Sequence, residues 1–283
     1  SSIMSWSRNR RGLYVHDALA DFHYDPKVLP SPIAQRKIYR SKLISTHLVG
    51  FGGGVSIGGT SYSFDGTTDF LSSPDHANWR LGTSGTGNFT IEAWVRNWTG
   101  GDEIIFGQLA DTNDGWRIAH DGAAIQIRQR ESSVSTLTHD ENWSPSADTW
   151  YHFAWIRGWG GQANDFAITI DGTILGSADT DAADIADFGY ALGVGGHSTA
   201  SLDDLSGNMD EIRISNTARW TTNFSPSTVE YTSDANTHLL IHCNEALTSG
   251  TTGSGAVFND SGNTTHAITE NGNAIRDTTI FKI

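Results

Sequence analysis

From residue 48 onward, short runs of alternating apolar and polar residues recur along the chain, separated by turns rich in Gly, Asn and Asp. A side-chain period of two is typical of strands that are buried on one face, so each run predicts a strand of an antiparallel sheet. In FTIEAWVR, one face carries Phe89, Ile91, Ala93 and Val95, and the other carries Thr90, Glu92, Trp94 and Arg96. The other runs of this kind are SYSF, EIIFGQ, GWRIAH, AIQIRQ, YHFAWIR, FAITI and DEIRIS.

The turns between these runs favour hairpins. ITIDGTILG places Asp171-Gly172 between two short runs, and this kind of dipeptide accepts the positive φ angles of a tight turn. Hairpins repeated at this spacing predict a sandwich of two antiparallel sheets and not a parallel α/β sheet. The 31 Gly and 10 Trp among 283 residues fit the same turn-rich, all-β expectation.

Residues 1–45 have a different pattern, because three prolines interrupt them and no alternation lasts more than a few residues. They are basic: residues 1–42 hold eight Lys and Arg against three Asp, a balance of +5, whereas the rest holds 10 basic and 29 acidic residues, a balance of −19. We expect an extended assembly arm that grips acidic neighbouring subunits; a disordered leader is the alternative. The expected arm residues are Trp6, Arg8, Arg10, Arg11, Tyr14, Phe22, Tyr24 and Tyr39.

Residues 236–283 contain two further strand patterns, THLLIHCNE and THAITENG. Two strands alone are marginally stable in water, so this segment is expected to join a sheet and not to form a domain of its own. The Gly-rich run LVGFGGGVSIGG is too weakly patterned to supply the opening strands of the sandwich. We therefore expect residues 236–283 to complete the sandwich of residues 46–235 within the chain, in preference to pairing with a neighbouring subunit.

Five elements in this order carry a family resemblance: SFDGTTDFLSSP, GNFTIEAWVR, DTWYHFAWIR, FAITIDGTILG and GNMDEIRISNTARW. Over about residues 48–220 the chain resembles the laminin-G-like branch of the concanavalin A-like lectin/glucanase superfamily, and its C-terminal part resembles linkers in tandem arrays of phage structural proteins. The resemblance implies an antiparallel jelly-roll β-sandwich. It leaves function open, because this fold serves lectins, glycosidases, adhesion modules and virion proteins.

Catalysis is not expected. Retaining glucanases of the resembling superfamily carry two carboxylates roughly 5 Å apart on one face of an E-x-D-x-E type strand. The nearest match is Asp210-Glu211, and neighbouring residues of a regular strand point to opposite faces. The single cysteine, Cys243, lies in no catalytic motif and is expected to be buried.

Two kinds of ligand are candidates. A structural Ca²⁺, as the resemblance implies for many jelly rolls, could take Asp65 and Asp210 among its roughly six to eight oxygen ligands; alternatively Asp65 is a turn residue and Asp210 pairs with Arg213. A glycan could stack on tryptophans next to polar or Gly-rich turns, unless these tryptophans cover the ends of the sandwich. The candidates are Trp98, Trp116, Trp143 and Trp159.

The function that we favour from the sequence is that of a phage virion structural protein, a capsid decoration, fibre or tail component made in the host cytoplasm, with virion proteins or its own copies as partners. A carbohydrate-binding lectin or adhesion module, which would be extracellular, is the alternative, and a glycoside hydrolase is a distant third. Nucleic acid is not an expected partner, because the body would repel it. The first residues show no signal-peptide pattern, and no run approaches the roughly 18 apolar residues of a membrane span.

Overall fold

The computed structural model describes residues 59–82, 87–98, 100–111, 113–197, 204–244 and 260–283, and the backbone of the strands at 6–8, 14–16 and 257–258. The chain divides into two compact units, Ser1–Val55 and Ser56–Ile283. In the first unit, β1 (Trp6–Arg8) and β2 (Tyr14–His16) pair as a short antiparallel hairpin. A purely extended arm would contain no such pair of hydrogen-bonded strands.

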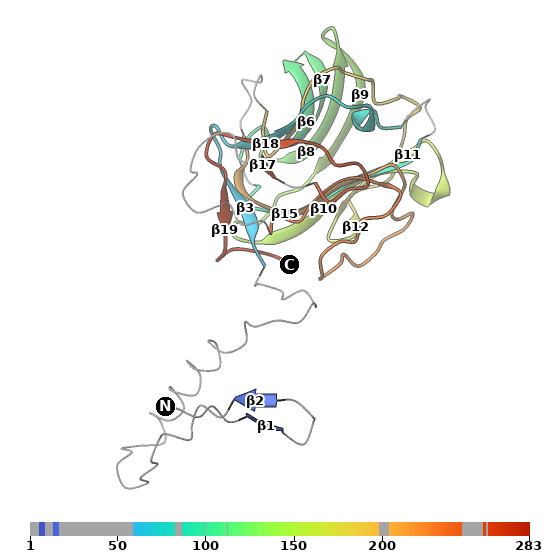
Figure 1. Ribbon diagram of the computed structural model, residues 1–283. Helices are drawn as coiled ribbons and strands as arrows, with labels where there is room; N and C mark the ends of the chain where they lie inside the picture. The colour runs from blue at the N-terminus through green and yellow to red at the C-terminus, as the bar shows by residue number, and fades with distance from the viewer. Residues whose placement is uncertain are drawn as a thin grey trace. The chain divides into compact units, whose positions relative to one another are not determined.

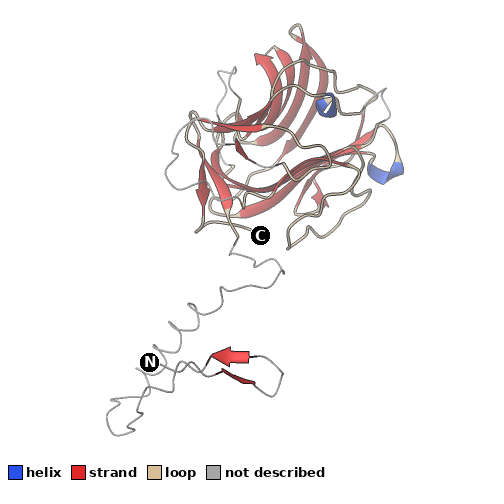
Figure 2. Ribbon diagram, viewed as in Figure 1, coloured by secondary structure: helices blue, strands red, loops and turns tan. Residues whose placement is uncertain are grey.

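The second unit is a sandwich of two antiparallel sheets with two 3-10 turns and no long helix among the described residues (Figures 1 and 2). The predicted all-β, antiparallel jelly-roll sandwich is therefore confirmed. The first sheet runs β12-β11-β10-β5-β15-β3-β19, with β13 beside β11 and β16 beside β15. The second runs β17-β18-β4-β14-β6-β7-β8-β9.

The nine-stranded sheet contains β3 (Ser61–Asp65), β5 (Phe89–Arg96), β10 (Trp150–Arg157), β11 (Asp165–Ile170), β12 (Thr173–Ile174), β13 (Asp179–Thr180), β15 (Ser206–Ser215), β16 (Thr237–Ile241) and β19 (Ile275–Asp277). The eight-stranded sheet contains β4 (Phe70–Ser73), β6 (Glu103–Asp111), β7 (Asp114–His120), β8 (Ala124–Glu131), β9 (Val134–Asn142), β14 (Leu192–Val194), β17 (Val257–Phe258) and β18 (Ile268–Asn271). The 3-10 turns are η1 (Ala77–Trp79) and η3 (Trp159–Gly161).

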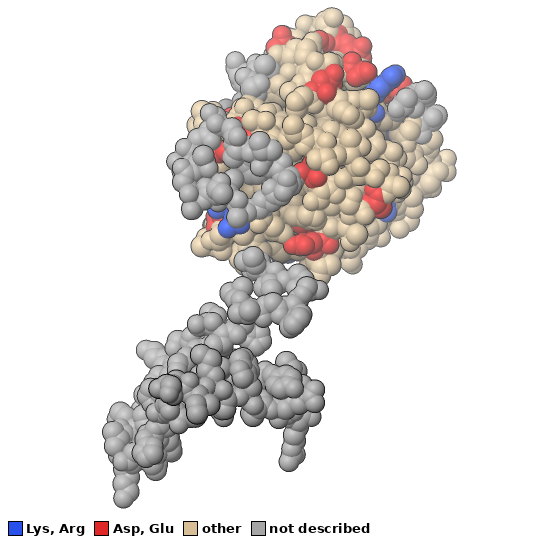
Figure 3. Space-filling model, in the orientation of Figure 1, with Lys and Arg blue, Asp and Glu red and all other residues tan. Residues whose placement is uncertain are grey.

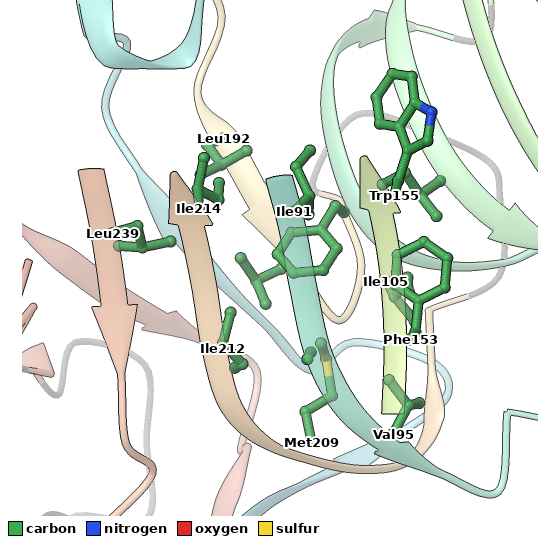
Figure 4. Close-up of a cluster of buried hydrophobic side chains, with 14 of the residues drawn as sticks. Ile91, Val95, Ile105, Phe153, Trp155, Leu192, Met209, Ile212, Ile214 and Leu239 are labelled. Carbon is green, nitrogen blue, oxygen red and sulfur yellow. The ribbon is translucent and has the colours of Figure 1, made fainter. Parts of the chain in front are cut away.

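The alternation in the sequence sets the core. Phe89, Ile91, Ala93 and Val95 of β5 all lie in the main apolar cluster between the sheets. Figure 4 shows how Leu239, Ile214, Ile91 and Phe153 from four neighbouring strands point into this cluster. The predicted hairpin turn is also present, because Asp171 and Gly172 have φ angles of 49° and 74° and β11 pairs with β12 across them.

The pattern of β5 predicted a half-buried strand with one solvated face. In the structure the second face is buried as well. Thr90, Glu92 and Trp94 are buried as well, with exposed fractions of 0 to 5%. Residues 216–235, which connect β15 to β16 and which we call the strap, cover this outer face. Strap residue Phe224 donates its backbone N–H to the Gly172 carbonyl, and a Cβ on Gly172 would lie 2.0 Å from the Phe224 carbonyl oxygen. Gly172 therefore serves both the turn and the close approach of the strap.

The C-terminal segment lies within both sheets of the same chain. β16 pairs with β15, β19 pairs with β3, and β18 pairs with β4. The face of THLLIHCNE that carries Leu239, Ile241 and Cys243 contributes to the core, and Cys243 is buried. The run LVGFGGGVSIGG, except for its last residue Gly59, lies outside the described residues.

Candidate functional site

Three loops meet at one end of the sandwich. The strand register brings the end of β5 to the start of β10 (Arg96 opposite Trp150), and the end of β7 to the start of β6 (His120 opposite Glu103). The end of β9 likewise lies opposite the start of β8. The loops that follow β5, β7 and β9 therefore share this end.

A stack of aromatic rings fills the space between these loops, and we call it the end cluster: Trp98, His120, Trp143, Tyr151 and Phe153. The ring centroids of Trp98 lie 5.6 Å from Phe153 and 5.9 Å from Trp143, and Trp143 meets Tyr151 edge to face at 5.0 Å. Phe153 and Trp98 are buried, whereas Trp143 and Tyr151 are only partly buried. The cluster thus runs from the core to the surface, where it presents two aromatic rings with polar atoms.

Backbone hydrogen bonds hold the cluster in place. The Trp98 indole N–H donates to the Glu103 carbonyl at 3.0 Å. Gly122 N–H donates to Nδ1 of His120 at 3.1 Å, so Nδ1 is the acceptor and Nε2–H donates to the Trp143 carbonyl at 3.0 Å. His120 therefore fixes the loop that carries Trp143, which keeps the Trp143 ring ordered before any ligand arrives.

Polar contacts hold the loop that runs from Trp143 to Tyr151. Arg96 forms an ion pair with Asp148, and Asp148 N–H donates to the Asn97 side chain. Asn97 and Asp148 both have left-handed backbone conformations, with φ of 61° and 58°. Ser146 N–H donates to the Tyr151 hydroxyl at 3.1 Å. Ligand sites commonly combine aromatic surface with a few fixed polar groups, and the Tyr151 hydroxyl is such a group here.

The four predicted ligand-binding tryptophans do not come together. Trp98 and Trp143 share the end cluster, but Trp98 is 1% exposed and supports Trp143 from below. Trp116 is also 1% exposed, faces the core from β7 and donates to Gln108. Both rings are buried because alternation within and next to strands turned them inward, and a ligand contact at Trp98 or Trp116 stays a prediction that their burial does not support. Trp159 is partly buried in η3, beyond the end of β10 that lies opposite the start of β5, at the other end of the sandwich.

Tyr151 and His120 are residues of this site that sequence reasoning missed. Tyr151 shares a face with Phe153 and Trp155 in YHFAWIR and is the outermost of the three. Its place at the strand end was the available signal. His120 gave no signal in sequence, since its role depends on contacts with the Gly100 and Trp143 carbonyls, which belong to other loops.

Asp65 and Asp210 do not lie together. Asp65 is opposite Ser206 in the β3–β15 pair, four residues along β15 from Asp210, a separation of about 13 Å. One Ca²⁺ with bonds of about 2.5 Å cannot bridge them. The two carboxylates therefore do not share an ion, and a Ca²⁺ at either one stays a prediction. No group of three or more His, Cys, Asp or Glu within the described ranges is arranged to hold a metal ion.

Asp65 closes the β3–β4 turn, as the alternative expectation had it. Its Oδ1 accepts backbone N–H groups from Thr67, Thr68 and Asp69 at 2.8, 2.9 and 3.3 Å. Burial raises the pKa of Asp65, but these hydrogen bonds outweigh it and hold the pKa below its ordinary value.

Asp210 and Glu211 lie on a β-bulge of β15, where Glu211 takes a φ of 47°. Oδ2 of Asp210 accepts backbone N–H groups from Lys282 and Ile283. Burial is the largest influence and raises the pKa of Asp210 to about 7. Glu211 accepts Tyr231 N–H at 2.7 Å and contacts His242 at 2.8 Å. Both carboxylates are fully buried and engaged, so the bulge is a structural joint and not a cleft for substrate.

Arg213 pairs with Glu92 and not with Asp210. Its Nη2 lies 2.6 Å from Oε1 of Glu92, whose Oε2 contacts Nε2 of His152 at 3.2 Å. Strap residue Tyr231 completes this buried network through its hydroxyl, 2.8 Å from Nε2 of His152. Burial alone would raise the pKa of Glu92, but His152 and Arg213 bring it below the ordinary value. The network anchors the strap on the outer face of the sheet.

The predicted arm lies almost entirely outside the described residues. Trp6, Arg8 and Tyr14 are in β1 and β2, of which only the backbone is described. Arg10, Arg11, Phe22, Tyr24 and Tyr39 fall outside the description. Within the described part of the chain, no helix is long and apolar enough to cross a membrane.

A family model described as concanavalin A-like lectin/glucanases superfamily, of the laminin G type, matches residues 65–222. This is more than half of the chain, and the protein therefore belongs to that superfamily. The resemblance that the five sequence elements indicated is confirmed.

Comparison with solved structures gives distant likenesses of fold. A protein from Bacteroides ovatus is 15% identical over 76% of this chain and 60% of its own, with a TM-score of 0.49. The SAP-like pentraxin of Limulus polyphemus is 15% identical over 59% of this chain and 81% of its own, with a TM-score of 0.41. Domains LG4-5 of the mouse laminin alpha1 chain are 12% identical over 61% of this chain and 48% of theirs, with a TM-score of 0.42. No curated protein matches the chain.

Proposed function

We propose that this protein is a non-catalytic glycan-binding module whose binding site is the end cluster. The observation that carries the proposal is the partly exposed pair Trp143 and Tyr151, with the Trp143 loop held by His120 and the Tyr151 hydroxyl accepting the Ser146 N–H. Aromatic faces stack on the apolar face of a sugar ring, while the polar atoms of the same rings, the Trp143 indole N–H and the Tyr151 hydroxyl, can hydrogen-bond to its hydroxyls.

The family to which the chain belongs includes lectins and glucanases. The positions of the buried carboxylates on the nine-stranded sheet favour a lectin over a glucanase. Hydrolysis would need two acidic side chains facing one accessible cleft. All three buried carboxylates have partners within the protein. Glu92 pairs with Arg213, and Asp210 accepts backbone N–H groups of Lys282 and Ile283. Glu211 contacts His242 and accepts the Tyr231 N–H from the strap. These groups serve the fold, so the proposal assigns them no part in a reaction.

Trp143→Ala tests the proposal, with Trp159→Ala as the matched control at the other end of the sandwich. A neutral glycan found on an array should lose at least about tenfold in affinity with Trp143→Ala, which corresponds to about 1.4 kcal/mol, and less than about twofold with Trp159→Ala. Melting curves confirm that both variants fold. The opposite ranking, with only Trp159→Ala affecting the affinity, would move the site to the η3 loop.

The role of a virion structural protein stays a prediction, together with virion partners and the assembly arm. It depends on the resemblance to phage repeats and on the basic balance of residues 1–42. Deletion of residues 1–45 should leave a folded sandwich that no longer assembles. Normal assembly of the truncated protein, followed by light scattering or microscopy, would remove the arm hypothesis while leaving glycan binding untouched.

A further inference from the structure

The outer face of the eight-stranded sheet carries a group of arginines that the end cluster does not use. Trp116 and Ile118 of β7 face the core, so Arg117 between them faces outward. Ile125 and Ile127 of β8 likewise face the core, which turns Arg128 and Arg130 outward. We call Arg117, Arg128 and Arg130 the arginine strip.

The strip places like charges side by side. Arg117 lies directly opposite Arg128 in the β7–β8 pair, and Arg130 lies opposite Gly115, two positions along the same face. Like charges at directly opposed positions cost up to about 1 kcal/mol, so this arrangement needs compensation from anions. Residues 43–283 contain only 10 basic residues, and three of them are gathered here.

The compensation within the chain is uneven. Arg128 holds Asp140 with two contacts, from Nη2 at 2.7 Å and from Nε at 3.4 Å. Arg117 has only Asp102, at 3.8 Å, and Asp102 is half exposed on a loop. Within the described residues the Arg117 side chain donates no hydrogen bond, although it is only 15% exposed. Burial, followed by the neighbouring arginines, lowers the pKa of Arg117, whereas Asp102 raises it.

A guanidinium offers five N–H donors in a planar fork that matches a carboxylate or a sulfate. Among the described residues, these donors at Arg117 have only the distant Asp102 carboxylate, and they lie next to two further cations on a sheet face that buries much of the side chain. Ile104, Leu109 and Ala119 form a small buried apolar cluster on the same face, which lowers the local dielectric constant and strengthens such a contact.

We propose that the arginine strip binds the anionic group of an acidic saccharide, a carboxylate or a sulfate, with Arg117 as the contact residue. The strip is thus a second binding surface, separate from the end cluster, and its ligand class rests on the proposed glycan-binding function. Because the body of the chain is strongly acidic, it does not attract polyanions in general, so binding there depends on this local geometry.

The ligand is sought by calorimetry with three hexasaccharides at low ionic strength: heparin-derived, with sulfates and carboxylates; hyaluronan, with carboxylates only; and neutral maltohexaose. Arg117→Gln should lower the affinity for the acidic probe that binds by at least about tenfold. Asp102→Asn should raise it a few-fold, because it removes the competing carboxylate. Arg80→Gln, a change at an exposed arginine after η1, should leave it within about twofold.

Binding of heparin alone identifies sulfate as the recognised group, and binding of both acidic probes identifies carboxylate. Equal loss with Arg117→Gln and Arg80→Gln, or no loss with Arg117→Gln, overturns the proposal. So does failure of both acidic probes to bind at all.

Titration with inorganic sulfate, followed through the side-chain NMR signal of Arg117, separates this proposal from the proposed function. A sulfate-dependent shift that Arg117→Gln abolishes supports the anion site even if no neutral glycan binds the end cluster. Glycan binding that Trp143→Ala removes, without any sulfate response at Arg117, retains the proposed function and rejects the arginine strip.

Discussion

The outer face of the nine-stranded sheet around β5 and that of the eight-stranded sheet around β8 and β9 have the same alternation of side chains but differ in how far their ion pairs are buried. On the nine-stranded sheet, Glu92, Arg213 and His152 are buried beneath the strap. On the eight-stranded sheet, Arg128 and Asp140 form a similar ion pair that remains partly exposed, with side-chain fractions of 27% and 35%. The space-filling view shows one side of the molecule, where acidic side chains are scattered and basic ones appear at few places (Figure 3). The difference teaches that coverage by a connecting segment, and not the strand pattern, decides whether a charged residue is structural or available for binding.

The largest expected effect is on the covered face. Arg213→Met should lower the free energy of unfolding by about 3 to 5 kcal/mol, because it leaves Glu92 buried without its cation. Arg128→Met, the matched change at a partly exposed pair, should cost less than about 1 kcal/mol. Urea unfolding of both variants measures the contrast, and similar losses at the two sites would contradict the comparison.

A second large effect concerns the pH dependence at Asp210. Its pKa of about 7 in the folded protein lies above the value of 3.8 for the free group, so folding favours the protonated acid. The penalty for ionised Asp210 is absent below about pH 4, grows as the pH rises to about 7 and stays constant above that, reaching about 4 kcal/mol. The stability of Asp210→Asn relative to the natural chain should therefore improve by up to about 1.4 kcal/mol per pH unit between pH 4 and 7. A pH-independent difference between the two proteins, in melts over this range, would remove the linkage.

A smaller effect should separate two tyrosine hydroxyls. Tyr231→Phe should lower stability by about 1 kcal/mol, because it removes the 2.8 Å contact to buried His152. Tyr190→Phe removes a 3.0 Å hydrogen bond to Asp114 on a partly exposed ring, and it should cost less than about 0.5 kcal/mol. Denaturation midpoints give the ranking, and a larger loss for Tyr190→Phe would show that the strap is not anchored at Tyr231.

The smallest effect is expected for Asp140→Asn on the open face. A partly exposed pair contributes about 0 to 1 kcal/mol, and salt screens it over about 8 Å at physiological ionic strength. Any loss of stability at low salt should therefore shrink at high salt. A loss of several kcal/mol that salt does not change would show that this face is covered in solution.

The sequence by itself determined the strands and their buried faces. FTIEAWVR forms β5 over the predicted residues, and the Asp171-Gly172 turn has the predicted backbone conformation, because period-two alternation and positive φ are local properties. The order of five such elements was also enough to identify the superfamily, which the match over residues 65–222 confirms. One edge strand, β9, was missed because its residues alternate without a continuous apolar face.

The tertiary structure alone decided which of the candidate residues can meet a ligand. Trp98, Trp116 and Trp143 all lie next to polar or Gly-rich turns in the sequence. In the structure Trp98 and Trp116 are buried, whereas Trp143 reaches the surface. Asp65 and Asp210 are both aspartates that could bind a metal ion, but they do not lie in one metal site, because the register of β3 on β15 separates them. The burial of Glu92 depends on where the strap passes, and a segment without periodicity carries no local signal of its path. These outcomes follow from contacts between residues far apart in the chain, which no single stretch of sequence specifies.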